Sequence, residues 1–203
     1  MISKFNILLI LLVGLAAYSI DQHRISKLHK LQIKDQQNHI DIITQENQEV
    51  LCENEMLLAV MDSLPLGSPI LDTIKISSNY GWRKRPLGLG YGFHAGLDIH
   101  ALWWDTVYSS GHGIVSSAYW MGGYGRCVVI EHAGGYESTY AHLYKIFVNK
   151  GDSIKRGQPI GRAGNSGAVT GAHLHYEIRR NGESADPLEY IDMIYKILKV
   201  NDN

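Results

Sequence analysis

Cysteine is scarce in this chain, which contains only Cys52 and Cys127. Structural zinc sites usually close with several cysteines, so a cysteine-rich site of that kind is excluded. Cys127 lies in a β-branched stretch, where a buried and inert thiol is expected. Cys52 lies next to a predicted helix seam and could cross-link two chains in an oxidising compartment. A bridge between Cys52 and Cys127 stays open as the alternative.

Glycine and proline are nearly absent from the first third of the 203 residues. Only Gly14 precedes residue 66, and all five prolines fall at or after Pro65. This composition predicts a helical first third followed by a turn-rich β domain of about 140 residues, which is long enough to have a core of its own.

An excess of basic charge is also missing. The net charge is −1, with five Lys and Arg against eight Asp and Glu in the first 65 residues, and 14 against 12 in the rest. Neither part has the strongly basic character of a nucleic-acid binder, so no nucleic-acid partner is expected.

Charged residues are absent from residues 7–20, an apolar run that follows Lys4. At 1.5 Å per residue this run reaches only about 21 Å, short of the roughly 30 Å hydrocarbon core of a membrane. Residues 1–20 are therefore either a secretory signal peptide or a membrane anchor that needs flanking residues to complete the span. We favour the anchor because a predicted stalk follows immediately. In both cases the rest of the chain is exported.

Residues 21–63 are predicted to form a helical coiled-coil stalk, because they lack glycine and proline and repeat apolar residues in heptads. Asparagines in such a seam set register and partner number at a cost in stability. The pattern predicts a homodimer, and a single helix packed on its own domain is the alternative. One seam row is Ile33, Ile40, Asn47, Asn54 and Met61, and the other is Ile43, Val50 and Leu57.

Residues 64–76 are predicted as a linker and residues 77–192 as the β domain. Residues 187–203 are expected to form a C-terminal helix and tail, with Asp186 as the cap and Pro187 in the first turn. The apolar stripe of that helix is Ile191, Ile194, Tyr195 and Leu198. Strands are expected between glycine turns, at residues 106–109, 113–120, 126–132, 136–143 and 173–180.

Two histidines stand two residues apart in the last of these strands. Its apolar side chains would face a core, whereas His173, His175 and Glu177 would share the other face. The two imidazoles are then about 7 Å apart along the strand, close enough to share a metal site. From the residues alone, either histidine could be the ligand.

Residues 94–100 alternate in the same way if they form one strand. The missing side chain at Gly96 then leaves room for an ion between His94 and Asp98. Two histidines and one carboxylate leave the fourth position of a tetrahedral zinc open for water. Other histidines of the β domain that could act as ligands are His100, His112 and His132.

Three motifs occur in order at compatible spacing: His-x-x-x-Asp from His94 to Asp98, Tyr140-Ala141-His142-Leu143, and His173-Leu174-His175. Together they resemble the LytM-type, or lysostaphin-like, zinc metallopeptidases of bacterial cell walls. The similarity covers roughly residues 77–190, and Ala172 stands where many members have proline. The resemblance implies a mainly β chain with a compact antiparallel β domain of the split-barrel, lysostaphin-like type.

The resemblance also implies a site with one Zn²⁺ ion. It assigns the metal to His94, Asp98 and His175, and it places His142 and His173 beside the attacking water as catalytic residues with undivided roles. The implied partner is peptidoglycan, whose peptide cross-links would be hydrolysed. The implied location is the periplasmic or cell-envelope face, with the N-terminal segment anchored in the inner membrane if it is not cleaved.

Substrate contacts are expected from loops with exposed aromatic residues and glycines around such a site. We select Tyr91, Trp120, Tyr124 and Asn165 as substrate-binding residues, with ordinary packing as the alternative for each. The basic run at residues 83–85 either meets wall carboxylates or is simply solvated.

Two other functions fit the same resemblance. One is a non-catalytic wall-binding regulator that activates a separate murein amidase, a role of relatives that usually lack the metal ligands. This chain keeps the full ligand set, which favours the enzyme. The other is a metalloendopeptidase that acts on protein, for which no sequence feature speaks.

Overall fold

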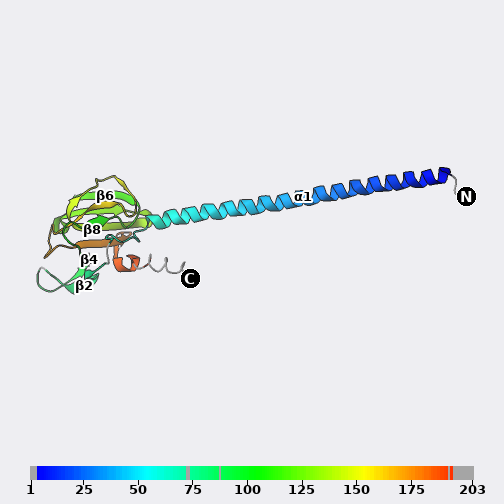
Figure 1. The fold of residues 1–203 in the computed structure, drawn as a ribbon. Helices are drawn as coiled ribbons and strands as arrows, with labels where there is room; N and C mark the ends of the chain where they lie inside the picture. Colours follow the sequence, from blue (N-terminus) through cyan, green and yellow to red (C-terminus); the bar gives the residue numbers. More distant parts are fainter. Residues whose placement is uncertain (1–3, 72–73, 87, 192, 194–203) are drawn as a thin grey trace. The chain divides into compact units, whose positions relative to one another are not determined.

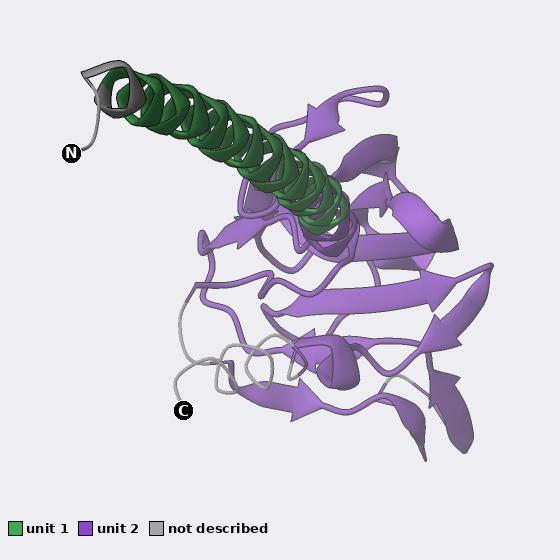
Figure 2. Cartoon of the chain, turned by 90° about the vertical axis from the view of Figure 1, so that its right-hand side faces the viewer, with its two compact units in different colours: residues 1–55 green, residues 56–203 purple. Residues whose placement is uncertain are grey.

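The computed structural model describes residues 4–71, 74–86, 88–191 and 193. The chain divides into two compact units, Met1–Glu55 and Met56–Asn203 (Figure 2).

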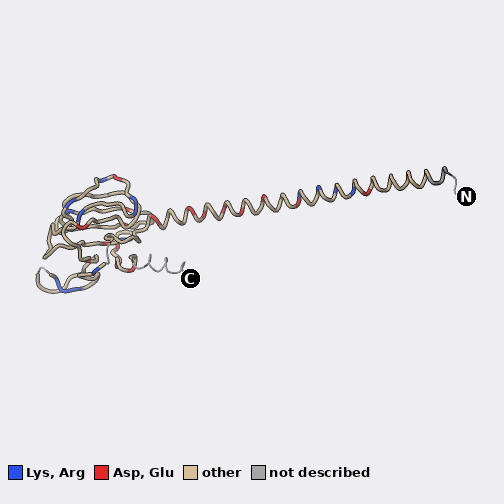
Figure 3. Tube along the Cα trace, in the orientation of Figure 1, with Lys and Arg blue, Asp and Glu red and all other residues tan. Residues whose placement is uncertain are grey.

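The first unit consists of most of one long helix, α1 (Lys4–Ser63). It is the one helix in the described chain that is long and apolar enough, by length and composition, to cross a membrane. After Lys4 the helix has no charged side chain until Asp21, and residues of both signs follow from there onward (Figure 3). The seam residues Ile33, Ile40 and Val50 are each more than half exposed, so the predicted seam lies bare along the helix.

In the described part of the second unit, twelve strands form a ten-stranded sheet and a separate two-stranded sheet. The main path of the large sheet is β1-β4-β11-β8-β7-β6-β9, and Figure 1 shows β4, β8 and β6 following one another across it. The strands are β1 (Ile76–Ser78), β2 (Gly81–Lys84), β3 (Tyr91–His94), β4 (Leu97–Ile99), β5 (Thr106–Tyr108), β6 (Gly113–Trp120), β7 (Arg126–Glu131), β8 (Tyr136–Ile146), β9 (Ser153–Ile154), β10 (Pro159–Ala163), β11 (Leu174–Arg180) and β12 (Glu183–Ala185), with two 3-10 turns, η1 (Gly122–Tyr124) and η2 (Ala133–Gly135).

All five predicted strands are confirmed, as β5, β6, β7, β8 and β11. Neighbouring strands pair antiparallel, as expected for a mainly β domain. Leu174, Tyr176 and Ile178 on β11 are fully buried in the hydrophobic core, which confirms the predicted alternation. The opposite face of β11 is therefore free to carry polar side chains.

The prediction that residues 94–100 form one strand is wrong. β3 ends at His94 and pairs with β2, whereas β4 begins at Leu97 and pairs with β1 and β11. The chain changes sheets at Gly96, where a Cβ atom would lie 2.6 Å from the carbonyl oxygen of Tyr176. The space next to Gly96 is therefore occupied by atoms of β11. It is not an open space between the two predicted ligands, His94 and Asp98.

The segment predicted as a linker packs on the β domain over its first part. Leu66 and Ile70 are buried, and the amide of Gly67 donates a hydrogen bond to the carbonyl of Ser110 at 2.7 Å. Arg156 donates to the backbone carbonyls of Met61 and Leu64. The last turn of α1 and the following residues therefore belong to the second unit, and the compact unit starts earlier than the predicted domain boundary.

The C-terminal helix begins as predicted. Residues 187–191 are helical, and the Asp186 carboxylate accepts a hydrogen bond from the amide of Leu188 at 3.0 Å. Ile191 joins the hydrophobic core. The rest of the predicted stripe, Ile194, Tyr195 and Leu198, lies outside the described residues.

Both cysteines are free, so the alternative of a bridge between them does not apply to this structure. Cys127 is fully buried on β7, and burial raises the pKa of its thiol to about 12. The prediction that Cys127 is buried is therefore confirmed, and the raised pKa agrees with an inert thiol. Cys52 is exposed on α1.

Candidate metal centre

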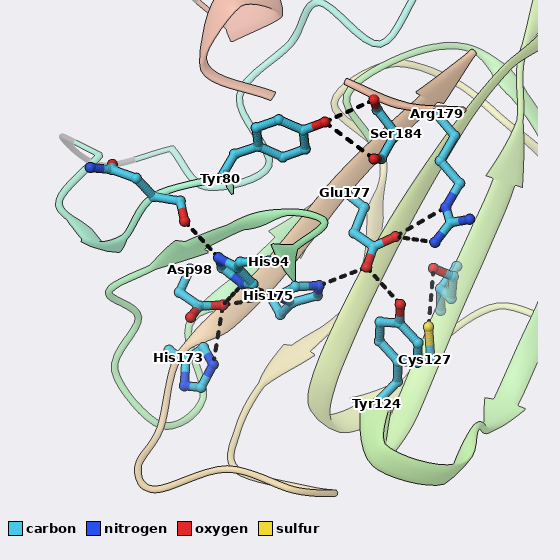
Figure 4. Close-up of polar contacts among 12 residues, drawn as sticks. Tyr80, His94, Asp98, Tyr124, Cys127, His173, His175, Glu177, Arg179 and Ser184 are labelled. Carbon is cyan, nitrogen blue, oxygen red and sulfur yellow. Dashed lines mark hydrogen bonds and ion pairs between the residues drawn. The ribbon is translucent and has the colours of Figure 1, made fainter. Parts of the chain in front are cut away.

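Side-chain atoms of His94, Asp98 and His175 converge on one point (Figure 4). Asp98 Oδ1 lies 2.9 Å from His175 Nδ1 and 3.1 Å from His94 Nε2, and the two nitrogens are 3.1 Å apart. All three residues are buried and form a group that could hold a metal ion. The register of the sheet places His175 directly opposite Asp98, while His94 reaches the same point from the end of β3.

Hydrogen bonds at the far nitrogens orient both imidazoles. His94 Nδ1 donates to the carbonyl of Asn79 at 2.7 Å, and His175 Nε2 donates to Glu177 Oε1 at 2.9 Å. These partners assign the tautomers, because a neutral imidazole carries one N–H and one lone pair. The lone pairs of His94 Nε2 and His175 Nδ1 therefore face Asp98 and each other.

Asp98 is held as a carboxylate with one oxygen directed at the cluster. Burial opposes its ionisation, but the neighbouring imidazoles of His175 and His94 outweigh burial and hold the pKa of Asp98 well below its usual range. Its second oxygen, Oδ2, accepts a hydrogen bond from Arg83 Nη2 at 3.2 Å. Of the basic run at residues 83–85, Arg83 thus contacts this buried carboxylate.

Two further histidines stand beside the cluster. The ring centroid of His142 lies 4.9 Å from that of His173 and 5.7 Å from that of His175. His142 Nδ1 donates to the carbonyl of Ser166 at 2.9 Å, and His173 Nδ1 donates to that of Gly171 at 2.9 Å. Both rings therefore keep the Nε2 lone pair available, and His173 Nε2 lies 3.5 Å from Asp98 Oδ1.

The backbone and the surroundings of His142 are unusual. Its φ is 62°, a left-handed conformation that non-glycine residues seldom adopt and that often marks functional positions. Burial lowers the pKa of His142 to about 4, so its imidazole is neutral at neutral pH. A neutral imidazole in this position can accept a proton.

The cluster opens into a groove of about 800 Å³. Of the four predicted substrate-binding residues, Tyr124 lines this groove, where its hydroxyl bonds to Glu177 at 2.6 Å. Among the described residues, Tyr91 and Asn165 are exposed outside its lining, and Trp120 lines a second groove. The lining consists of Ser77, Ser78, Arg83, Lys84, Pro86, Phe93, His94, Ala95, Asp98, Gly123, Tyr124, His142, Ala168, Val169, Thr170, His173, His175 and Glu177.

The other candidate histidines lie away from the cluster. His100 is exposed, and His132 is buried with Nε2 2.7 Å from Ser138 Oγ and Nδ1 bonded to the carbonyl of His112. Sequence patterns did not predict that Glu177, Asn79 and Ser166 bond to the imidazoles of the site. Only Glu177 was indicated by the sequence, because it shares the polar face of its strand with His175.

The antiparallel sheet thus presents a buried cluster of two histidines and one carboxylate that could hold a metal ion, with two more histidines beside it. Residues 92–187 match the model of peptidase family M23, and the chain belongs to that family. The lysostaphin-like fold expected from the sequence is confirmed by the structural comparisons.

Three similar proteins illustrate the relationship. DD-carboxypeptidase/endopeptidase Mpg of Neisseria meningitidis is 39% identical over 114 residues, which are 56% of this chain and 26% of Mpg. A zinc-containing peptidase from Vibrio cholerae has a TM-score of 0.56 at 35% identity, covering 61% of this chain and 38% of that one. The catalytic domain of lysostaphin from Staphylococcus simulans has a TM-score of 0.53 at 30% identity, covering 59% and 92%. This chain therefore spans about a quarter of the curated relative's length.

Proposed function

We propose that this protein is an exported, zinc-dependent endopeptidase that hydrolyses peptide cross-links of bacterial peptidoglycan. The observation that carries the proposal is the convergence of His94 Nε2, Asp98 Oδ1 and His175 Nδ1 within hydrogen-bonding distance of one another. Further support comes from relatives of the same family that are named as peptidoglycan endopeptidases.

The donor set fits a zinc ion. Ligands of a tetrahedral zinc with bonds of about 2.0 Å lie about 3.3 Å apart, and the three donor atoms here are 2.9–3.1 Å apart. Imidazole and carboxylate suit several divalent metals, and the zinc-containing structural relative favours zinc. We propose His94, Asp98 and His175 as ligands of one ion. Such an ion polarises a peptide carbonyl and lowers the pKa of water.

His142 and His173 are the proposed catalytic residues. Each has its Nδ1 proton bonded to a backbone carbonyl, so each offers Nε2 to the groove. One Nε2 would take the proton of the attacking water. The other imidazole, in its protonated form, would stabilise the oxyanion or hand a proton to the leaving amine. The two backbone carbonyls hold both rings in place for these transfers, and the geometry leaves the roles undivided.

Digestion of purified sacculi tests the proposal. The full chain in detergent should release fragments with new amino termini within cross-links, as read by mass spectrometry, and a zinc chelator should stop the release. Intact cross-links together with stimulation of an added murein amidase would support the regulator and contradict the enzyme. Cleavage of casein at a comparable rate would instead indicate a protein-directed peptidase.

We propose that the second groove, with a volume of about 740 Å³, contacts the glycan strand next to the cross-link. Aromatic faces suit sugar rings, and its cations suit the carboxylates that wall polymers carry. The guanidinium of Arg126 lies 6.0 Å from the ring centroid of Trp120, which is 56% exposed. No acidic residue lines this groove among the described residues, whose lining is Tyr119, Trp120, Arg126, Tyr144, Lys145 and Ile146. Tyr124 in the catalytic groove, and Tyr91 and Asn165 outside it, remain proposed contacts of the same substrate.

Trp120→Ala should therefore weaken the cleavage of sacculi. Loss of an aromatic contact with a bound partner costs at least about 1 kcal/mol, so KM for sacculi should rise roughly fivefold. Cleavage of a small cross-linked muropeptide, too short to reach the second groove, should not change. Leu71→Ala, which truncates another exposed apolar side chain, is the control. An equal loss on both substrates, or none, would contradict the glycan contact.

We propose that the apolar start of α1 anchors the protein in the inner membrane and that its heptads pair two chains as a stalk, with the domain at the periplasmic face. The exposed seam of Ile33, Ile40, Ile43 and Val50 supports pairing, because apolar rows of this kind are normally covered. Sedimentation of the full chain in detergent should give a dimer at micromolar concentration. A monomer under those conditions would refute the coiled coil.

A further inference from the structure

Glu177 is a carboxylate that is only 1% exposed, yet it accepts four hydrogen bonds (Figure 4). Oε1 accepts from the Tyr124 hydroxyl at 2.6 Å and from His175 Nε2 at 2.9 Å. Oε2 accepts from Arg179 Nε at 3.1 Å and Nη2 at 2.9 Å. Burial alone would raise the pKa of Glu177, but these bonds outweigh burial and keep the pKa below its usual value.

The position of these residues argues against a purely structural tie. His175, Glu177 and Arg179 alternate along one face of β11, so their contacts join no two strands of the large sheet. Tyr124 arrives from η1, at the rim of the groove. A buried charge is costly unless its hydrogen bonds are satisfied, and here two of the four bonds are made by the oxygen that faces His175.

The hydrogen bond from His175 Nε2 to Glu177 decides which nitrogen of the ring can bind a metal. With the proton on Nε2, the lone pair is on Nδ1, which faces Asp98 and His94. With the proton on Nδ1, the same ring would present a donor to the other two ligand atoms. A carboxylate in this place also raises the basicity of the ligand nitrogen.

We infer that Tyr124, Glu177 and Arg179 are positioning residues that hold the metal-binding orientation of His175 and thereby set the zinc affinity of the site. This inference rests on the proposed zinc site. Arg179 and Tyr124 fix the carboxylate, and the carboxylate fixes the imidazole. Tyr124 thus acts inside the site, beside its predicted contact with substrate.

Glu177→Gln is the decisive substitution because it keeps the shape and removes one acceptor. An amide has a single acceptor oxygen, whereas the carboxylate serves donors at both oxygens. If the amide oxygen faces His175 and Tyr124, its NH₂ group opposes the Arg179 guanidinium. If the amide is turned round, its NH₂ group opposes the His175 N–H and favours the wrong tautomer.

The experiment measures zinc dissociation constants of the full chain in detergent, stripped of metal and titrated against a competing fluorescent chelator. Loss of a partner of this kind costs about 10–100-fold in metal affinity, so Glu177→Gln should raise the dissociation constant by that factor. The melting temperature of the metal-free protein separates this effect from damage to the fold. A merely structural role would lower the melting temperature and leave the dissociation constant unchanged, which would overturn the inference.

Tyr124→Phe and Tyr80→Phe form a matched pair. Each removes one tyrosine hydroxyl, but the Tyr80 hydroxyl bonds to the carbonyl of Ser184 at 2.9 Å, away from Glu177. Tyr124→Phe should weaken zinc binding severalfold in the wild-type background and have no effect in Glu177→Gln, because both act through one carboxylate. Tyr80→Phe should have no effect in either background. Additive losses would contradict the network.

The outcomes also separate this inference from the proposed function. Zinc binding by the wild type with unchanged affinity in Glu177→Gln sinks the inference alone. If Glu177→Gln binds zinc more weakly but the zinc-loaded wild type leaves sacculi uncut, the proposed hydrolysis is refuted and the positioning network is not. A wild type that binds no zinc would refute both.

Discussion

His175→Ala is expected to abolish both zinc binding and cross-link hydrolysis. His175 faces Asp98 across the β4–β11 pair, and its Nδ1 lies within 3.1 Å of both other donor atoms. Alanine leaves two donors, too few for a tetrahedral site with one open position. Loss of the metal removes several kcal/mol of transition-state stabilisation, so turnover should fall at least about a thousandfold.

Two measurements check this prediction: the zinc content of the purified variant by plasma mass spectrometry, and the rate of fragment release from sacculi. His100→Ala is the matched control, because it removes an exposed imidazole that lies outside the cluster. It should keep about one zinc per chain and full turnover. One equivalent of zinc in His175→Ala would refute its assignment as a ligand.

His142→Ala should separate chemistry from metal binding. The ring of His142 lies beside those of His173 and His175, but its Nδ1 bonds to the carbonyl of Ser166 and it is no member of the three-residue cluster. Zinc content should therefore be unchanged. Positioned acid-base groups contribute about 100–10,000-fold, and kcat should fall within that range.

The same two assays decide the outcome for His142→Ala. A variant that loses its zinc would move His142 from the catalytic role to the metal site. A variant with wild-type kcat would remove it from the mechanism. His173→Ala, measured in parallel, shows whether the two neighbouring imidazoles contribute equally.

Local patterns predicted much of the β domain. The alternation in residues 174–178 fixes which side chains of β11 enter the core, because a strand repeats every two residues. The Asp186 cap and the burial of Cys127 could also be predicted, because each depends on a few neighbouring residues. The ordered histidine motifs indicated which residues the fold brings together.

Contacts between distant segments could not be predicted in this way. The break between β3 and β4 depends on how closely β11 approaches Gly96, which no local pattern encodes. The carbonyls of Asn79 and Ser166 orient two imidazoles, yet a backbone carbonyl has no sequence signature. The packed start of the predicted linker likewise depends on Leu66 and Ile70 meeting a surface formed far along the chain.

The change of sheets at Gly96 has a mechanical consequence. His94 closes the strand of the small β2–β3 sheet, whereas Asp98 and His175 belong to the large one. An ion bound by all three residues would link the β2–β3 hairpin to the large sheet. Removal of that ion should allow the hairpin to open locally while the core strands stay paired. The metal centre would then also stabilise the domain that forms it.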